Sequence, residues 1–188
     1  MTFKNLQSFT LVITGPMGSG KTTELFRQLE RVEIAGGKTV LFKPLLDNRS
    51  EGVRTHMGFE RKAVSLEKAE RIFDFVDSSI AAVGIEEAQF FDDTICEVVR
   101  KLVRQGQKVF VAGLDLDFMG RPFGPMPRLL AYAEYVIKLQ AVCRICGQDA
   151  SRVARKTSEN GQVLVGGMDV YQPVCTKCHE KWLSEQAG

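Results

Sequence analysis

The sequence has no apolar run near the roughly 20 residues that a membrane-spanning helix needs. It also lacks an excess of one charge, because 25 Lys and Arg stand against 23 Asp and Glu, a net charge of +2. Charge alone therefore gives no reason to expect a nucleic-acid or membrane surface. Repeats, low-complexity tracts and a signal-peptide pattern are absent as well. We expect a cytoplasmic protein.

What is present is typical of one globular domain with room for a small appendage. The 188 residues are 44% hydrophobic and 26% charged, which is enough apolar material for a core. Four of the five cysteines form two Cys-x-x-Cys pairs, Cys143 with Cys146 and Cys175 with Cys178. The fifth, Cys96, stands alone in a helical pattern, where we expect a small buried residue.

Hydrophobic periodicity alternates between strand and helix over the first three quarters of the chain. Strands are expected over residues 9–14, 39–42, 81–85, 108–112 and 135–139. Helices are expected from residue 21 to about 35, and over 66–76, 95–102 and 129–133, with a long loop over 44–64. This order predicts an α/β fold of the P-loop NTPase type, a mostly parallel sheet with helices on both faces. We expect it to span 1–139, followed by a small zinc-binding lobe over 140–188 that ends in a helix.

The strongest motif is Gly15-Pro-Met-Gly-Ser-Gly20-Lys21-Thr22, which fits G-x-x-x-x-G-K-T and lies between an expected strand and an expected helix. Glycines let backbone N–H groups approach phosphate oxygens, and the helix N-terminus adds partial positive charge. Lys21 can reach the β- and γ-phosphates, and the Thr22 hydroxyl can hold Mg²⁺. The alternative is a glycine-rich turn with a chance lysine.

Two adjacent carboxylates, Glu86 and Glu87, follow the expected strand over 81–85. The carboxyl end of a parallel strand is where ligands bind, and a P-loop enzyme needs an acidic residue there to support Mg²⁺. Neighbouring side chains on an extended strand point to opposite sides, so one could face the metal and the other a substrate. The alternative is a solvated helix start with favourable acidic residues.

The two cysteine pairs have the ligand spacing of a tetrahedral Zn²⁺ site. Four thiolates leave no open coordination position, so such a site is structural. A redox role is the alternative. His179 follows Cys178 directly and could replace it as a ligand, although Cys178 completes a symmetric pair.

Residues 113–127 form a Gly- and Pro-rich segment that carries Phe118, Arg121 and Phe123. An aromatic on an irregular loop at this sheet edge can stack on a base, and simple hydrophobic packing of the loop is the alternative. The run over 163–167 followed by Tyr171 reads, on pattern alone, as a strand, a Gly-Gly turn and a packed tyrosine.

Together these segments resemble the zinc-containing, P-loop type of thymidine kinase family over nearly the whole chain. The matching motifs are Gly15-Pro-Met…Gly-Lys-Thr, Asp47-x-Arg49, Glu87-Ala-Gln-Phe-Phe91, Gly113-Leu-Asp-x-Asp-Phe118…Arg-Pro-Phe-Gly, Lys138-Leu-x-Ala-Val-Cys-x-x-Cys146, Val165-Gly-Gly-x-Asp-x-Tyr171 and Cys175-x-x-Cys-His179.

The resemblance implies transfer of the γ-phosphoryl group of ATP to the 5′-hydroxyl of thymidine, and of deoxyuridine, for DNA precursor salvage. It implies Glu87 as general base, ATP and Mg²⁺ as cofactors, structural Zn²⁺, a homotetramer and feedback inhibition by dTTP. The implied ATP and Mg²⁺ residues are Gly15, Pro16, Met17, Gly18, Ser19, Gly20, Lys21, Thr22, Asp47, Arg49, Glu86 and Gln89. The implied nucleoside residues are Met17, Phe118, Gln162, Val163, Leu164, Val165, Gly166 and Tyr171.

Three positions depart from the family pattern. Glu86 stands where Asp is common, and its extra methylene favours a water bridge to Mg²⁺ over direct contact. Gly18 stands where a bulky Phe is common, which loosens the loop. After Arg49 only the Thr55-His56 pair follows the usual form. These departures bear on substrate stringency more than on reaction class.

Two other functions fit parts of the sequence. A recombinase-like P-loop ATPase would use Glu87 to activate water instead of a sugar hydroxyl. The second alternative is a zinc-ribbon binding module with a vestigial nucleotide-binding fold. The nearly neutral net charge argues against both as nucleic-acid binders.

Overall fold

A computed structural model describes residues 8–46, 52–55, 58–156 and 170–186. Its centre is a six-stranded sheet in the order β5-β2-β6-β7-β1-β8, in which every neighbouring pair is parallel. The strands are β1 (Thr10–Thr14), β2 (Lys38–Pro44), β5 (Val64–Leu66), β6 (Ile80–Ile85), β7 (Lys108–Gly113) and β8 (Tyr135–Lys138). The predicted α/β fold is confirmed.

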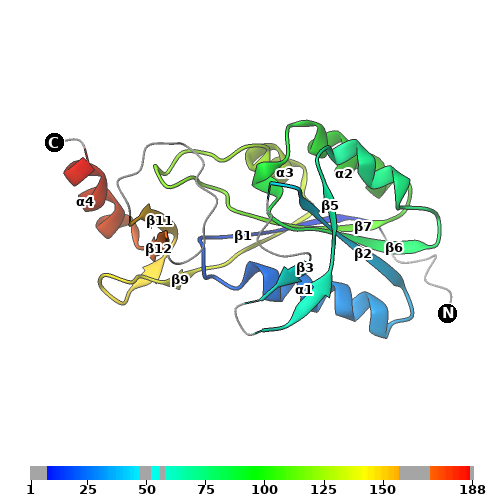
Figure 1. The fold of residues 1–188 in the computed structure, drawn as a ribbon, viewed down its shortest axis with the longest axis horizontal. Helices are drawn as coiled ribbons and strands as arrows, with labels where there is room; N and C mark the ends of the chain where they lie inside the picture. Colours follow the sequence, from blue (N-terminus) through cyan, green and yellow to red (C-terminus); the bar gives the residue numbers. More distant parts are fainter. Residues whose placement is uncertain (1–7, 47–51, 56–57, 157–169, 187–188) are drawn as a thin grey trace.

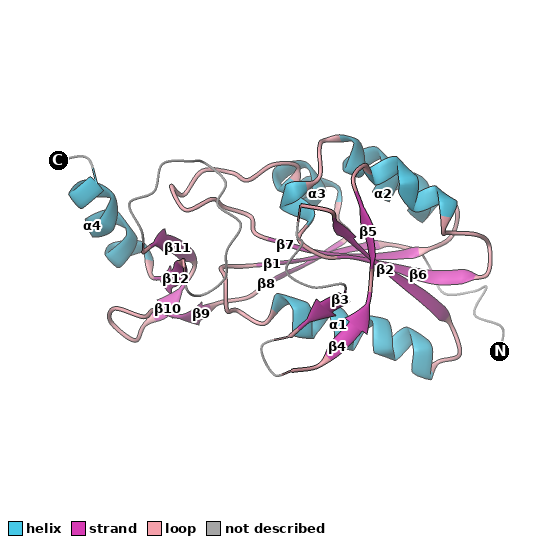
Figure 2. Ribbon diagram, viewed as in Figure 1, coloured by secondary structure: helices cyan, strands magenta, loops and turns pink. Residues whose placement is uncertain are grey.

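Helices cover both faces of this sheet (Figure 1; Figure 2). One face carries α1, and the opposite face carries α2, α3 and a 3-10 helix, η2, while a second 3-10 helix, η3, follows β6. Their bounds are α1 (Lys21–Ile34), α2 (Thr94–Arg104), α3 (Met126–Tyr132), η2 (Ala69–Asp74) and η3 (Ala88–Phe90).

Apolar spacing explains why these helices lie where they do. In α2 the buried residues are Ile95, Cys96, Val98, Val99 and Leu102, one stripe at helical spacing that packs on the sheet. Cys96 is fully buried, as predicted. Among the described residues no helix is long and apolar enough to cross a membrane.

Residues 44–64 and 66–76 differ from the prediction. The expected loop contains a short antiparallel pair, β3 (Gly52–Arg54) and β4 (Glu60–Lys62), and leads into β5. Strands of three residues are too short to show a period, so the pattern gave no signal. The expected helix over 66–76 is wrong at its start, because Leu66 pairs with Pro44 in the sheet, and within the rest only Ala69–Asp74 is helical, as the 3-10 helix η2.

The C-terminal segment forms a separate lobe at the end of the molecule to which β1 and β7 lead (Figure 1). It contains β9 (Ala141–Val142), β10 (Asp149–Ala150), β11 (Arg152–Arg155), β12 (Tyr171–Val174) and the predicted terminal helix α4 (Thr176–Gln186). These strands form two-stranded antiparallel sheets, β9 with β10 and β11 with β12. Their own small apolar cluster includes Cys143, Val174 and, at its margin, Trp182.

Candidate functional site

The glycine-rich segment joins the carboxyl end of β1 to the first residue of α1, Lys21. Gly15 has φ of 137°, and a Cβ there would lie 2.3 Å from the carbonyl oxygen of Leu139, so only glycine fits. Gly18 and Gly20 also have positive φ, and Gly20 caps α1. The segment therefore has the backbone of an anion-binding loop at a helix N-terminus.

Lys21 and Thr22 extend from the first turn of α1 toward two different groups. Lys21 Nζ donates a hydrogen bond to the carbonyl oxygen of Pro16 at 3.0 Å, so the ammonium group lies over the loop. The Thr22 hydroxyl donates to Glu86 Oε1 at 2.6 Å. This contact joins the loop to the carboxyl end of β6 although the residues are 64 apart in the sequence.

Glu86 and Glu87 have different surroundings. Glu86 is 4% exposed, and its backbone N–H donates to the Phe42 carbonyl at 2.9 Å, which continues the sheet by one residue. Glu87 is half-buried, has φ of 50° and caps η3; among the described non-glycine residues it alone has positive φ. The two side chains are thus separated by a left-handed turn, and not by the strand pleat that we expected.

Gln89 holds the carboxylate of Glu87. Its Nε2 donates to Glu87 Oε2 at 2.6 Å, and its Oε1 accepts the backbone N–H of Leu114 at 3.0 Å. The Leu114 contact determines which end of the amide is the acceptor, and so directs the NH₂ group to Glu87. Gln89 itself is 3% exposed, and the two ends of its amide bind Glu87 and the backbone directly after β7.

The segment after β7 folds back on itself around Asp117. Asp117 Oδ1 accepts the backbone N–H groups of Met119 and Arg121, both at 2.9 Å. Phe118, at the tip of this turn, is half-buried, and the guanidinium carbon of Arg155 lies 3.9 Å from its ring centroid. One face of the predicted stacking residue is therefore covered by a cation.

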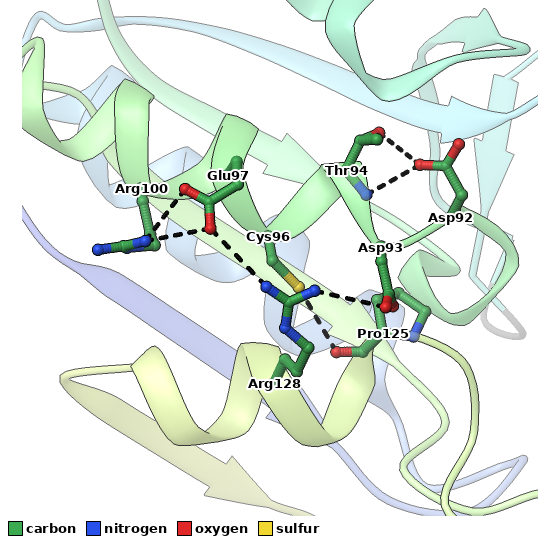
Figure 3. Close-up of polar contacts among 8 residues, drawn as sticks. All are labelled: Asp92, Asp93, Thr94, Cys96, Glu97, Arg100, Pro125 and Arg128. Atoms are coloured by element: carbon green, nitrogen blue, oxygen red, sulfur yellow. Dashed lines mark hydrogen bonds and ion pairs between the residues drawn. The ribbon is translucent and has the colours of Figure 1, made fainter.

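Figure 3 shows how α3, which follows this segment, is attached to α2. Guanidinium nitrogens of Arg128 lie 3.4 Å from a carboxylate oxygen of Asp93 and 3.8 Å from one of Glu97. The Cys96 sulfur lies 3.8 Å from the Pro125 carbonyl oxygen. Burial raises the pKa of Cys96, so this thiol stays protonated. The ion pairs are exposed and therefore individually weak, but together they join the end of the segment to the body of the fold.

The two cysteine pairs meet in the C-terminal lobe. The sulfur atoms of Cys143, Cys146, Cys175 and Cys178 all lie within 4.8 Å of one another, and Cys146 and Cys175 are 3.6 Å apart. Sulfurs around tetrahedral Zn²⁺ would be about 3.8 Å apart, because Zn–S bonds are about 2.3 Å long. The cluster therefore fits Zn²⁺.

The thiols of the cluster differ in protonation, and the contact with the Cys175 sulfur raises the pKa of Cys178 to about 12. Burial acts to raise the pKa of Cys143, but backbone N–H groups donating to its sulfur outweigh burial and lower the pKa to about 6. This thiol gives up its proton readily, as a metal ligand must. His179 is outside the cluster: its Nε2 lies 2.7 Å from the carbonyl oxygen of Phe118. The structure thus favours Cys178 over His179 as the fourth ligand.

Not every predicted site residue can be placed. Asp47, Arg49 and the run Gln162, Val163, Leu164, Val165 and Gly166 lie outside the described residues. Tyr171 is described: it is buried, and its hydroxyl accepts a hydrogen bond from Arg155 at 3.2 Å. Met17 is half-buried within the glycine-rich segment.

Sequence reasoning missed two buried cations near these elements. Arg155 is 5% exposed and contacts both Phe118 and Tyr171. Lys43, at the carboxyl end of β2, is 1% exposed, and its Nζ donates to the Gly52 carbonyl at 3.2 Å. A charged residue inside an apolar strand pattern was a usable signal for Lys43, since lysine is rarely buried.

Comparison with known proteins agrees with this arrangement. The family model described as thymidine kinase matches residues 8–179 of the chain. A thymidine kinase of Rhodothermus sp. (strain ITI 518) is 44% identical over 171 residues, which cover 90% of this chain and 80% of that protein.

Proposed function

Because the chain belongs to the thymidine kinase family, we propose that it transfers the γ-phosphoryl group of ATP to the 5′-hydroxyl of thymidine. The products are ADP and thymidine monophosphate, a DNA precursor, and deoxyuridine is a second acceptor. One observation supports this proposal above the others: the Thr22–Glu86 hydrogen bond brings the glycine-rich loop to the same sheet edge as Glu87. A phosphate cradle and a carboxylate base then share one site.

Glu87 is the proposed general base. A sugar hydroxyl is a poor nucleophile, so its proton must leave as the new O–P bond forms. The hydrogen bond from Gln89 orients one carboxylate oxygen, and the bond from Leu114 to Gln89 anchors that contact to β7. Gln89, which we predicted among the ATP residues, has contacts that support positioning of Glu87 instead.

The first turn of α1 is the proposed nucleotide site. Backbone N–H groups of the segment from Gly15 to Gly20 bind the phosphates, and Lys21 neutralises the charge that develops on the transferred group. Thr22 and Glu86 would hold Mg²⁺, which supplies charge neutralisation at the phosphate oxygens when bound. Pro16, Met17, Gly18 and Ser19 complete the loop, and Asp47 and Arg49 remain proposed contributors.

The nucleoside site is proposed between the glycine-rich segment and the C-terminal lobe. Phe118 stacks on thymine through the face that Arg155 leaves open, with Met17 near the base and Tyr171 on the lobe side. Gln162, Val163, Leu164, Val165 and Gly166 remain proposed for the same pocket. The separate apolar cluster of the lobe supports a boundary between 1–139 and 140–188.

Assembly and regulation are proposed from the family: a cytoplasmic homotetramer that is inhibited by dTTP. Exposed apolar side chains on the edge strand β8, Tyr135 and Val136, support a subunit interface. Light scattering after size exclusion tests the tetramer, and initial rates with added dTTP test the inhibition.

The activity is tested with ATP, Mg²⁺ and one acceptor at a time, either one of the four DNA deoxynucleosides or deoxyuridine, followed by mass identification of any monophosphate. Thymidine and deoxyuridine should be converted, and deoxyadenosine and deoxyguanosine should not. ATP consumption independent of any nucleoside would favour the recombinase-like ATPase, which family membership does not favour.

A further inference from the structure

The turn that carries Phe118, at the tip of the segment after β7, contacts the C-terminal lobe. His179 Nε2 lies 2.7 Å from the carbonyl oxygen of Phe118, and His179 is 3% exposed. A carbonyl oxygen can only accept, so Nε2 carries the hydrogen and donates it. Because the side chain is shielded from water, loss of this bond is not offset by solvent.

We propose that His179 is a positioning residue for the nucleoside: it fixes the backbone of Phe118 and thereby sets the plane of the Phe118 ring. The inference rests on the proposed function, in which that ring stacks on the base. It assigns to α4 a part in substrate binding that is separate from metal binding by the neighbouring cysteines.

The tip is shaped to receive the imidazole. Asp117 accepts two N–H groups of the turn, which sets the turn's shape from within. Gly120 has φ of 76°, and a Cβ there would lie 3.2 Å from His179 Cε1. A larger residue would be strained and would press on the ring, so the absence of a side chain at this position leaves room for His179.

Side chains of the lobe also contact the Phe118 ring. The Arg155 guanidinium carbon lies 3.9 Å from the ring centroid, and the Trp182 ring is tilted by 77° to the Phe118 ring, with the centroids 6.2 Å apart. The imidazole of His179 stacks on Trp182 at 5.7 Å with an interplanar angle of 26°. Three residues of the lobe therefore contact Phe118, and its orientation depends on the lobe as well as on the sheet that carries it.

The start of α4 connects this contact to the cysteine cluster. The backbone N–H of His179 donates to the Cys175 carbonyl at 2.9 Å, one helical turn back. The imidazole is thus carried on the same turn as two cluster cysteines, Cys175 and Cys178, while its own Nε2 is used at Phe118. His179 is therefore placed to position Phe118 and is not one of the four residues of the metal-binding cluster.

Two variants of His179 separate the hydrogen bond from ring packing. His179→Phe keeps an aromatic ring against Trp182 but has no donor. His179→Gln loses the ring but can place an amide N–H near the position of Nε2. The exposed neighbour Glu180 supplies a matched control, Glu180→Gln, in the same helix turn.

Thymidine affinity is measured by calorimetry, and the KM values for thymidine and ATP by steady-state kinetics. We expect His179→Phe to raise the thymidine Kd and KM by about 5- to 10-fold, the range for one shielded hydrogen bond. The kcat, the ATP KM and the zinc content should stay as in the wild type, and His179→Gln should recover most of the affinity. Glu180→Gln should not differ from the wild type.

A third measurement needs no ligand. Trp182 is the single tryptophan of the chain and lies beside Phe118, so acrylamide quenching of its fluorescence reports release of the tip. Quenching should increase in His179→Phe relative to the wild type. Because this variant keeps a ring against Trp182, the increase would report release of the tip and not loss of packing on the indole.

Several outcomes would overturn the inference. These are unchanged thymidine affinity in His179→Phe, an equal rise in the ATP KM, loss of zinc, or failure of His179→Gln to recover any affinity. The last three would mean that His179 serves the fold of the lobe. A wild-type protein that binds no thymidine would overturn the proposed function instead, and the quenching comparison would still decide whether His179 fixes the tip.

Discussion

The two adjacent carboxylates should respond differently to the same change, Glu to Gln. At Glu87 the amide can turn its oxygen toward Gln89 and keep the 2.6 Å contact, so the shape of the site is retained while the base is lost. A positioned carboxylate base contributes about 10²- to 10⁴-fold in rate, or about 3–5 kcal/mol at 1.36 kcal/mol per decade. We expect Glu87→Gln to lower kcat by that factor and to leave thymidine binding nearly intact.

At Glu86 the amide oxygen can still accept the hydrogen bond from Thr22, so the contact between loop and sheet remains. What is lost is the negative charge beside the proposed Mg²⁺ position. Glu86→Gln should therefore raise the Mg²⁺ concentration needed for half-maximal rate, and excess Mg²⁺ should partly restore activity. Glu86→Asp keeps the charge and should be less affected, although its shorter side chain lengthens the reach to Thr22.

The assay is the initial rate of thymidine monophosphate formation across a Mg²⁺ titration, with thermal unfolding as a control for intact fold. Both Gln variants should unfold near the wild-type temperature, because each keeps its hydrogen bond. The reasoning is refuted if excess Mg²⁺ restores Glu87→Gln and not Glu86→Gln. The two carboxylates would then have exchanged roles, and the left-handed turn at Glu87 would present the metal ligand instead of the base.

Three further changes test other parts of the site. Cys175→Ser should lower the zinc content from about one per chain and reduce the melting temperature, since a structural zinc site contributes directly to folding; unchanged metal content by atomic absorption would contradict this. Phe118→Ala should raise the thymidine KM roughly 10- to 100-fold by removing a stacking surface and leave the ATP KM unchanged, so an equal rise in both would place Phe118 outside the nucleoside site. Gly15→Ala should abolish ATP binding or folding, because its Cβ would lie 2.3 Å from the Leu139 carbonyl; calorimetric binding of ATP at wild-type affinity would show that the loop can relax.

Motifs and strands made of neighbouring residues were predicted well, because their structure depends on the local backbone and on residues a few positions apart. The glycine-rich segment from Gly15 to Thr22 carries its own turn, cap and helix start in eight adjacent residues. An unbroken apolar run, such as the one in β6, predicts a strand buried on both faces, and this prediction does not depend on the position of the strand in the sheet. Two Cys-x-x-Cys pairs implied one tetrahedral cluster, since each pair can supply only half of it.

Features that join distant residues were decided by the tertiary structure. From the order of residues alone, Glu86 and Glu87 were expected to end a buried strand, but the turn at Glu87 decides which of them reaches Thr22. The sequence also left Cys178 and His179 as alternative ligands, and the packing of α4 favours Cys178, because it directs the imidazole to Phe118. A single sequence records the order of side chains. Their pairing across 61 or 64 positions depends on how sheet and lobe pack, which no local pattern encodes.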